Sequence, residues 1–195
     1  MCFTKYLKLL ILLFFTFVLN ISNANQFNGS VNLENVELGK TQVNGSAEFK
    51  NSKFQSLEVN GTLDFQDLII AESVKVNGTI KGKHIQCRYL IVSGDLEGNS
   101  IHVKGDTRIS GYFNVSNSSF EDLEISSKKI VLNNTTTKNI VIKASKNNAK
   151  QQIILNGTTI VNGNIIFESG FGEVVLDKKA KIQGQVSGGE TKYMN

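Results

Sequence analysis

A short motif, an apolar residue followed by a polar residue and glycine, returns along the chain at a nearly constant spacing. In its first six copies the glycines are Gly29, Gly45, Gly61, Gly78, Gly94 and Gly111, separated by 16 or 17 residues. Further copies occur at Gly163 and Gly184. A regular internal repeat constrains the fold strongly, because each copy is expected to form one structural unit that packs on its neighbours.

The apolar residues between these glycines keep the same register. Two residues after the glycine stand Val31, Ala47, Leu63, Ile80, Leu96, Phe113 and Ile165. A set of hexapeptides, from LENVEL at Leu33 to VSNSSF at Val115, favours apolar or small residues at the first, fourth and sixth positions. The third position holds Asn, Asp, His or Ser. Alternation with period two predicts short β-strands.

Short strands that recur with constant spacing and direction describe a coil, not an antiparallel meander. We therefore predict an all-β fold, a single-stranded parallel β-helix (β-solenoid) of roughly nine or ten coils over residues 25–189, with a polar tail at 190–195. Coils stacked at about 4.8 Å would form a rod roughly 45 Å long. No single coil could bury its own apolar face, so the core depends on stacking.

The glycine of the motif is expected at a corner with positive φ, which glycine adopts without steric cost. Asparagine tolerates the left-handed region and bonds its own backbone, so it suits the preceding position. We predict that the asparagines stack into a ladder of amides. The predicted corner residues are Asn28, Gly29, Asn44, Gly45, Asn60, Gly61, Asn77, Gly78, Gly94, Gly111, Gly163 and Gly184.

Two polar segments interrupt the apolar columns, near residues 133–152 and 168–172. We expect both to be loops that project from the rod. They lack aromatic or charged clusters, so spacer insertions are favoured over binding loops.

The segment 1–24 has the layout of a secretory signal. Lys5 and Lys8 precede an apolar run from Leu9 to Leu19, and Ser22-Asn23-Ala24 follows. We expect a mature chain that begins at Asn25 and is exported to the periplasm, the cell surface or the extracellular space. An uncut membrane anchor is the alternative, although the run is about half of the ~20 residues that span a bilayer.

Charge and cysteine content argue against several functions. Without Lys5 and Lys8 the net charge is near +2, and the basic residues are scattered, which argues against nucleic-acid binding. Cys87 is the one cysteine beyond the signal segment, so no intramolecular disulfide can form. It falls in the column of Leu38, Phe54, Ile70 and Val103 and is expected to be buried. His84 and His102 do not supply the three or four ligands of a zinc site, so we expect no metal and no cofactor.

Asp95 and Asp106 are the carboxylates that could approach each other as an acid–base pair. Both flank glycine turns, where Asp is common for backbone reasons, so we expect no enzymatic activity. Several Asn-X-Ser/Thr triplets, the sequence of N-glycosylation sites, coincide with the corner motif. The turn explains these asparagines without glycosylation.

The run VNGTIKGKHIQCRYLIVSGDLEGNSIHVKGDTRISG resembles the bactofilins, bacterial polymer-forming proteins whose domain is a right-handed parallel β-helix. The likeness covers Phe27 to about Gly111. It implies nucleotide-free, end-to-end polymerisation into a scaffold at a membrane or wall, here in an exported variant.

The end coils of any solenoid expose unpaired backbone groups and an open core, which is a template for pairing. Here the ends would present Phe27, Val31 and Leu33, and Ile182 and Val186. We expect a non-enzymatic structural protein that self-associates through these ends and touches a membrane only through its signal segment. Two alternatives remain: an adhesin or ligand-binding rod with a cell-envelope or host-surface partner, and an enzyme that modifies wall polysaccharide.

Overall fold

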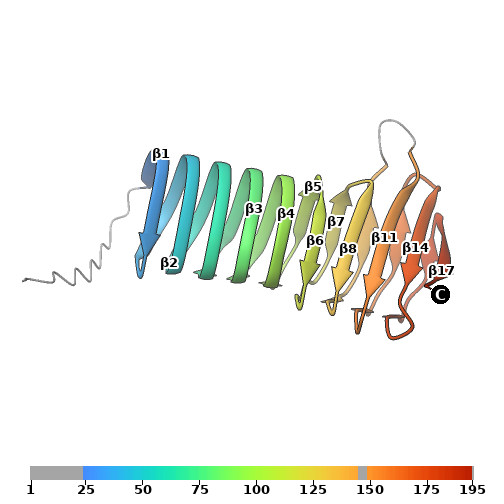
Figure 1. Ribbon diagram of the computed structural model, residues 1–195. Coiled ribbons are helices and arrows are strands. Elements are labelled where there is room, and N and C mark those ends of the chain that lie inside the picture. Colours follow the sequence, from blue (N-terminus) through green and yellow to red (C-terminus); the bar gives the residue numbers. More distant parts are fainter. Residues whose placement is uncertain (1–23, 145–148, 195) are drawn as a thin grey trace, which may run out of the picture.

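The computed structural model describes residues 24–144 and 149–194, so the predicted signal segment lies outside the described residues except for Ala24. The described chain is all-β and winds into a parallel β-solenoid of about 10 turns, as predicted (Figure 1). Every pairing between strands is parallel. The first strand, β1 (Asn25–Glu34), begins at the first residue of the expected mature chain.

Three long strands follow β1 and bend around the corners without interruption; after them each coil is divided into shorter strands. The long strands are β2 (Glu37–Ile70), β3 (Ser73–Cys87) and β4 (Tyr89–Val103). The shorter strands are β5 (Thr107–Ser110), β6 (Phe113–Ser116), β7 (Leu123–Ser126), β8 (Lys129–Asn133), β9 (Thr136–Thr137), β10 (Ile140–Ile142), β11 (Gln151–Asn156), β12 (Ile160–Val161), β13 (Ile165–Phe167), β14 (Gly172–Leu176), β15 (Lys181–Ile182), β16 (Val186–Ser187) and β17 (Gly189–Tyr193).

Equivalent residues of successive coils lie directly above one another. Val59 pairs with Val76, and Val76 pairs with Val92. The next column holds Leu63, Ile80, Leu96 and Phe113, all fully buried. These columns form one continuous apolar core along the axis. The predicted vertical alignment is therefore confirmed.

The glycine motif forms one corner of each coil in the first part of the rod. Gly45, Gly61, Gly78, Gly94 and Gly111 have φ values between 139° and 143°. A Cβ on any of them would overlap the carbonyl oxygen of the glycine one coil below. Glycine is required here both for its φ and for the close approach of two backbones.

A second corner uses non-glycine residues in the left-handed region. Its members are Asn35, Asn51, Asp67, His84, Ser100, Asn117 and Asn134, with φ between 43° and 57°. In the first six of these, the residue is the third position of the hexapeptides, where the sequence holds Asn, Asp, His or Ser. Asn and Asp are among the side chains that tolerate this conformation best, because they bond locally. The sequence shows these residues at the third position of the hexapeptides, but it does not predict that they form a corner.

Gly163 and Gly184 lie at a different corner from the first six glycines. Gly184 stacks on Gly163, and neither has a positive φ. Ile165 accordingly pairs with Ile140 and belongs to the column of Leu90, not to that of Leu96. The assignment of these two glycines to the first corner is therefore wrong. That corner continues instead through Ser127, because Ser110 pairs with Ser126.

The polar segment 133–152 is mostly part of the coil. It contains β9 and β10, and Thr135 and Thr137 are buried inside the rod. The connection between β10 and β11 contains residues 145–148, which lie outside the described residues. The turn between β13 and β14 agrees with the predicted second loop. The predicted polar tail is instead strand β17, which pairs with β14 and closes the last coil.

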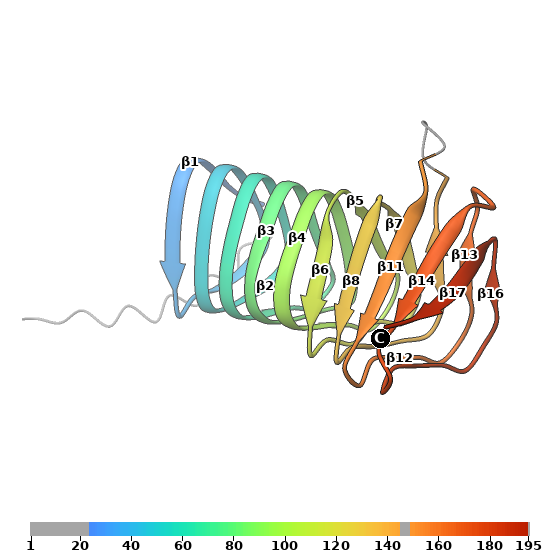
Figure 2. The same ribbon diagram turned by 45° about the vertical axis from the view of Figure 1, so that its right-hand side comes forward.

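The rod is not uniform along its length. In the first coils one turn uses few residues, so that Phe27 pairs with Val43. Toward the other end each turn takes more of the chain, and Ile140 pairs with Ile165. Figure 2 shows the wider coils and their longer connections at the C-terminal end. Within residues 24–144 and 149–194, no helix is long and apolar enough to cross a membrane.

Candidate functional site

The N-terminal end of the rod presents an apolar surface, which we call the N-terminal end face. It consists of Phe27, Val31, Leu33, Val36 and Leu38, all partly buried against the core. The residues one coil below the first three, Val43, Ala47 and Phe49, are buried. Among the described residues, strand β1 pairs only with β2, so its other edge has no backbone partner there. Both features arise because no described coil covers the first one.

The C-terminal end face is chemically different. The inward positions of the last coil are taken by Ile182, Val186, Gly188, Thr191 and Tyr193. Ile182 and Val186 are partly buried, whereas the Tyr193 side chain is 71% exposed. The sequence predicted Ile182 and Val186 at this end but missed the contribution of β17.

Four charged side chains form an ionic cluster on the outer face of β14 and β17. Lys150 contacts Glu173 and lies 2.8 Å from Glu190, and Lys192 lies 2.9 Å from Glu173 and 3.1 Å from Glu190. The hydrogen bond from Lys150 is the main cause that lowers the pKa of Glu173 to about 2. The bonds to Glu173 and Glu190 raise the pKa of Lys150 to about 12. No fixed period in the sequence could have revealed this cluster, because its members come from coils of unequal length.

The predicted amide ladder lies beside the glycine corner. The Nδ2 atoms of Asn44, Asn60 and Asn77 each donate to the Oδ1 atom of the asparagine one coil below, at 3.0, 2.9 and 2.7 Å. Asn51 likewise donates to Asn35 at the second corner. These amide nitrogens already donate hydrogen bonds within the fold, which agrees with a structural role for the asparagines.

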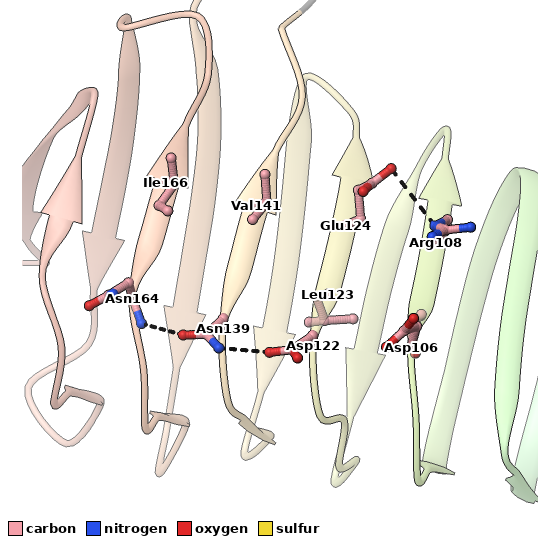
Figure 3. Close-up of a pocket in the computed structure, with 10 residues that line it drawn as sticks. Asp106, Arg108, Asp122, Leu123, Glu124, Asn139, Val141, Asn164 and Ile166 are labelled. Atoms are coloured by element: carbon pink, nitrogen blue, oxygen red, sulfur yellow. Dashed lines mark hydrogen bonds and ion pairs between the residues drawn. The ribbon is translucent and has the colours of Figure 1, made fainter.

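A shallow groove of about 470 Å³ crosses the side of the rod over β5, β7, β10 and β13 (Figure 3). Its polar edge is a chain of bonds in which Asn139 Nδ2 donates to Asp122 Oδ1 at 2.7 Å and the Asn164 backbone N–H donates to Asn139 Oδ1 at 3.0 Å. Val141 and Ile166 supply apolar surface beside this edge, in one row with Glu124 on the neighbouring strand. The groove combines amide and carboxylate groups with aliphatic surface but is open to solvent. Sequence reasoning did not single out these residues.

Candidate metal ligands do not converge. His84 Nδ1 lies 2.8 Å from Asp67 Oδ1 at the second corner, and His102 Nδ1 lies 2.8 Å from Ser119 Oγ. Cys87 is buried between Ile70 and Val103 in the predicted column, and burial raises the pKa of its thiol to about 12. Among the described residues, no group of three or more His, Cys, Asp or Glu side chains could hold a metal ion.

Asp95 and Asp106 lie at different corners. Asp95 follows Gly94 at the glycine corner, and its Oδ1 accepts from the backbone N–H of Tyr112 at 3.0 Å. Asp106 precedes β5 at the edge of the groove. The structure does not bring the two carboxylates together across one corner.

Comparison with family models, with curated proteins and with solved structures finds no match to this chain.

Proposed function

We propose that this protein is an exported structural protein without enzymatic activity, and that it self-associates through the N-terminal end face. The observation that supports this proposal is the set of five partly buried apolar side chains on a coil whose outer strand edge has no partner among residues 24–144 and 149–194. The resemblance of residues 27–111 to the bactofilins supports the same mechanism of assembly without nucleotide.

Two physical terms favour association at this face. Covering the five side chains removes apolar surface from water, which stabilises a contact by about 25 cal/mol per Å². A second strand at the free edge of β1 would also satisfy backbone donors and acceptors that otherwise bond only to water. Both terms need a partner that offers an apolar surface and a strand edge together, and a second copy of this chain offers both.

Sedimentation velocity of the chain beginning at Asn25 tests the proposal. We expect an assembly larger than a monomer at micromolar concentration, and Val31→Lys should dissociate it because the lysine places a charge in the contact. Ser30→Lys is the matched control, since Ser30 is exposed on the same strand and should leave the assembly intact. A strict monomer in which Val31→Lys changes nothing would count against self-association.

A ligand-binding rod is the second candidate, and the groove over β5, β7, β10 and β13 favours it. Its polar edge and aliphatic surface suit an extended hydroxylated ligand such as a glycan chain. Val141→Lys should abolish binding on a glycan array, whereas Gln86→Lys, on another face of the rod, should not. Glycan binding by a strictly monomeric protein would favour this function over the first.

A further inference from the structure

We infer that assembly stops at a closed dimer in which two copies meet by their N-terminal end faces, with their C-terminal end faces pointing outward. This inference rests on the proposed self-association and specifies its partner surface and its limit. Two differences between the two ends carry it.

The first difference is chemical and can be followed along single columns of the core. The column that begins with Val31 ends with Thr191, and the column that begins with Leu33 ends with Tyr193. The column that begins with Phe27 passes through Phe167 and ends at Gly188. In a head-to-tail stack, Phe27 and Val31 would therefore face Gly188 and Thr191, and Leu33 would face the exposed Tyr193. Two N-terminal end faces bring apolar surface onto apolar surface.

The second difference is the size of the coils. At the N-terminal end Phe27 pairs with Val43, whereas near the C-terminal end Ile165 pairs only with Val186, so the last coils take up more of the chain than the first. A head-to-tail contact would place the narrow first coil on a wider one, so corners and strands could not all stay aligned. Two identical N-terminal coils are equal in size, so neither overhangs the other.

Symmetry then limits the assembly. Two N-terminal end faces are related by a two-fold axis perpendicular to the rod, and the strands that meet run antiparallel. Such an isologous contact uses the same surface on both copies and is closed, because no second N-terminal end face is left free. Head-to-tail contacts would instead repeat without limit and produce filaments.

The mass of the assembly and the relative orientation of its two copies test the inference, using the chain that begins at Asn25. Sedimentation velocity should give twice the monomer mass and no larger species as the concentration rises. For orientation, donor and acceptor dyes are placed on Ser30→Cys or Ser187→Cys in a background in which Cys87 is replaced by Ala. Energy transfer should be strongest between two copies labelled at position 30, weaker between copies labelled at 30 and 187, which lie about one rod length apart, and weakest between two copies labelled at 187. Tyr193→Lys, at the C-terminal end face, should leave the dimer unchanged.

The outcomes separate this inference from the function on which it rests. Filaments, growth beyond two copies, stronger transfer between positions 30 and 187 than between two copies labelled at 30, or dissociation by Tyr193→Lys would overturn the closed dimer and leave self-association standing. A monomer at all concentrations would overturn both.

Discussion

Asn60 illustrates how one side chain of the rod acts in two coils at once. Its Nδ2 atom donates to Asn44 Oδ1, and its Oδ1 atom accepts from Asn77 Nδ2. The uncharged amide carries an NH₂ donor and a carbonyl acceptor, so it can bond to the coil on either side, whereas a carboxylate can only accept. This explains why asparagine, and not aspartate, precedes the glycine in the first four copies of the motif.

Asn60→Asp should therefore destabilise the fold at pH 7 by about 1–2 kcal/mol, because a carboxylate cannot donate to Asn44 and faces its oxygen instead. Urea denaturation measures the change. Gln66→Glu makes the same amide-to-carboxylate change at an exposed side chain for which the described part of the chain shows no hydrogen bond, and it should have little effect. Equal losses in the two variants would mean that the ladder contributes nothing.

Gly78 and Gly29 distinguish the two reasons for glycine at this corner, which are the positive φ and the close approach of the neighbouring backbone. A Cβ at position 78 would overlap the Gly61 carbonyl oxygen, whereas one at position 29 meets nothing within 4 Å. Both have positive φ, so both alanine variants carry backbone strain of about 1–3 kcal/mol. Gly78→Ala should cost clearly more than Gly29→Ala in urea denaturation. Similar costs would mean that the coils can separate locally to admit a methyl group.

At the scale of the element, the sequence predicts strands, coil length and one corner wherever the repeat is regular. The period and the apolar register over residues 27–113 together specify which residues stack. After Gly111 the same corner is formed without glycine, and the motif at Gly163 recurs on another corner, so glycine spacing alone misassigns it. Segment 133–142 was mistaken for a loop because buried threonines, such as Thr135 and Thr137, replace apolar residues inside the coil.

Strand β17 is expected to be sensitive to acid because its outer face depends on ionised Glu173. The pKa of Glu173 is lowered from 4.5 to about 2, first by the hydrogen bond from Lys150. A lowered carboxyl pKa stabilises the fold above the unfolded-state pKa, and this contribution is lost as the pH falls from about 4.5 to about 2. Protection factors of β17 amides in hydrogen exchange should fall over this range.

Glu173→Gln should remove that pH dependence, and high salt should weaken it because its partners Lys150 and Lys192 are exposed. Asp64→Asn is the control, since Asp64 makes no ion pair within the described residues and should leave the profile of β17 unchanged. Unaltered protection of β17 at pH 2 in the unmodified protein would show that backbone pairing with β14 is sufficient to hold the last strand.

At the scale of the whole molecule, a solenoid is held together by contacts between neighbouring coils. Each coil contacts only the one before it and the one after it, so stability is close to a sum of local terms. Damage at one end should then stay at that end, while damage in the middle should open the middle. The same property confines an end-to-end contact to the first coil and leaves the rest of the rod unchanged.

The rate of Cys87 labelling can test whether damage stays local. Cys87 lies in the middle of the rod and is the one thiol in a chain that begins at Asn25. Its side chain is buried and its pKa is raised to about 12, so a thiol reagent reacts at pH 7 only after the surrounding coils open. Gly78→Ala, one coil corner away, should accelerate labelling by about tenfold for each 1.4 kcal/mol that it removes from the local opening free energy. Val31→Lys, on the first coil, should leave the rate unchanged. Equal acceleration by both variants would mean that the rod opens as a single cooperative unit, and the contacts between coils would then have to transmit strain along the whole axis.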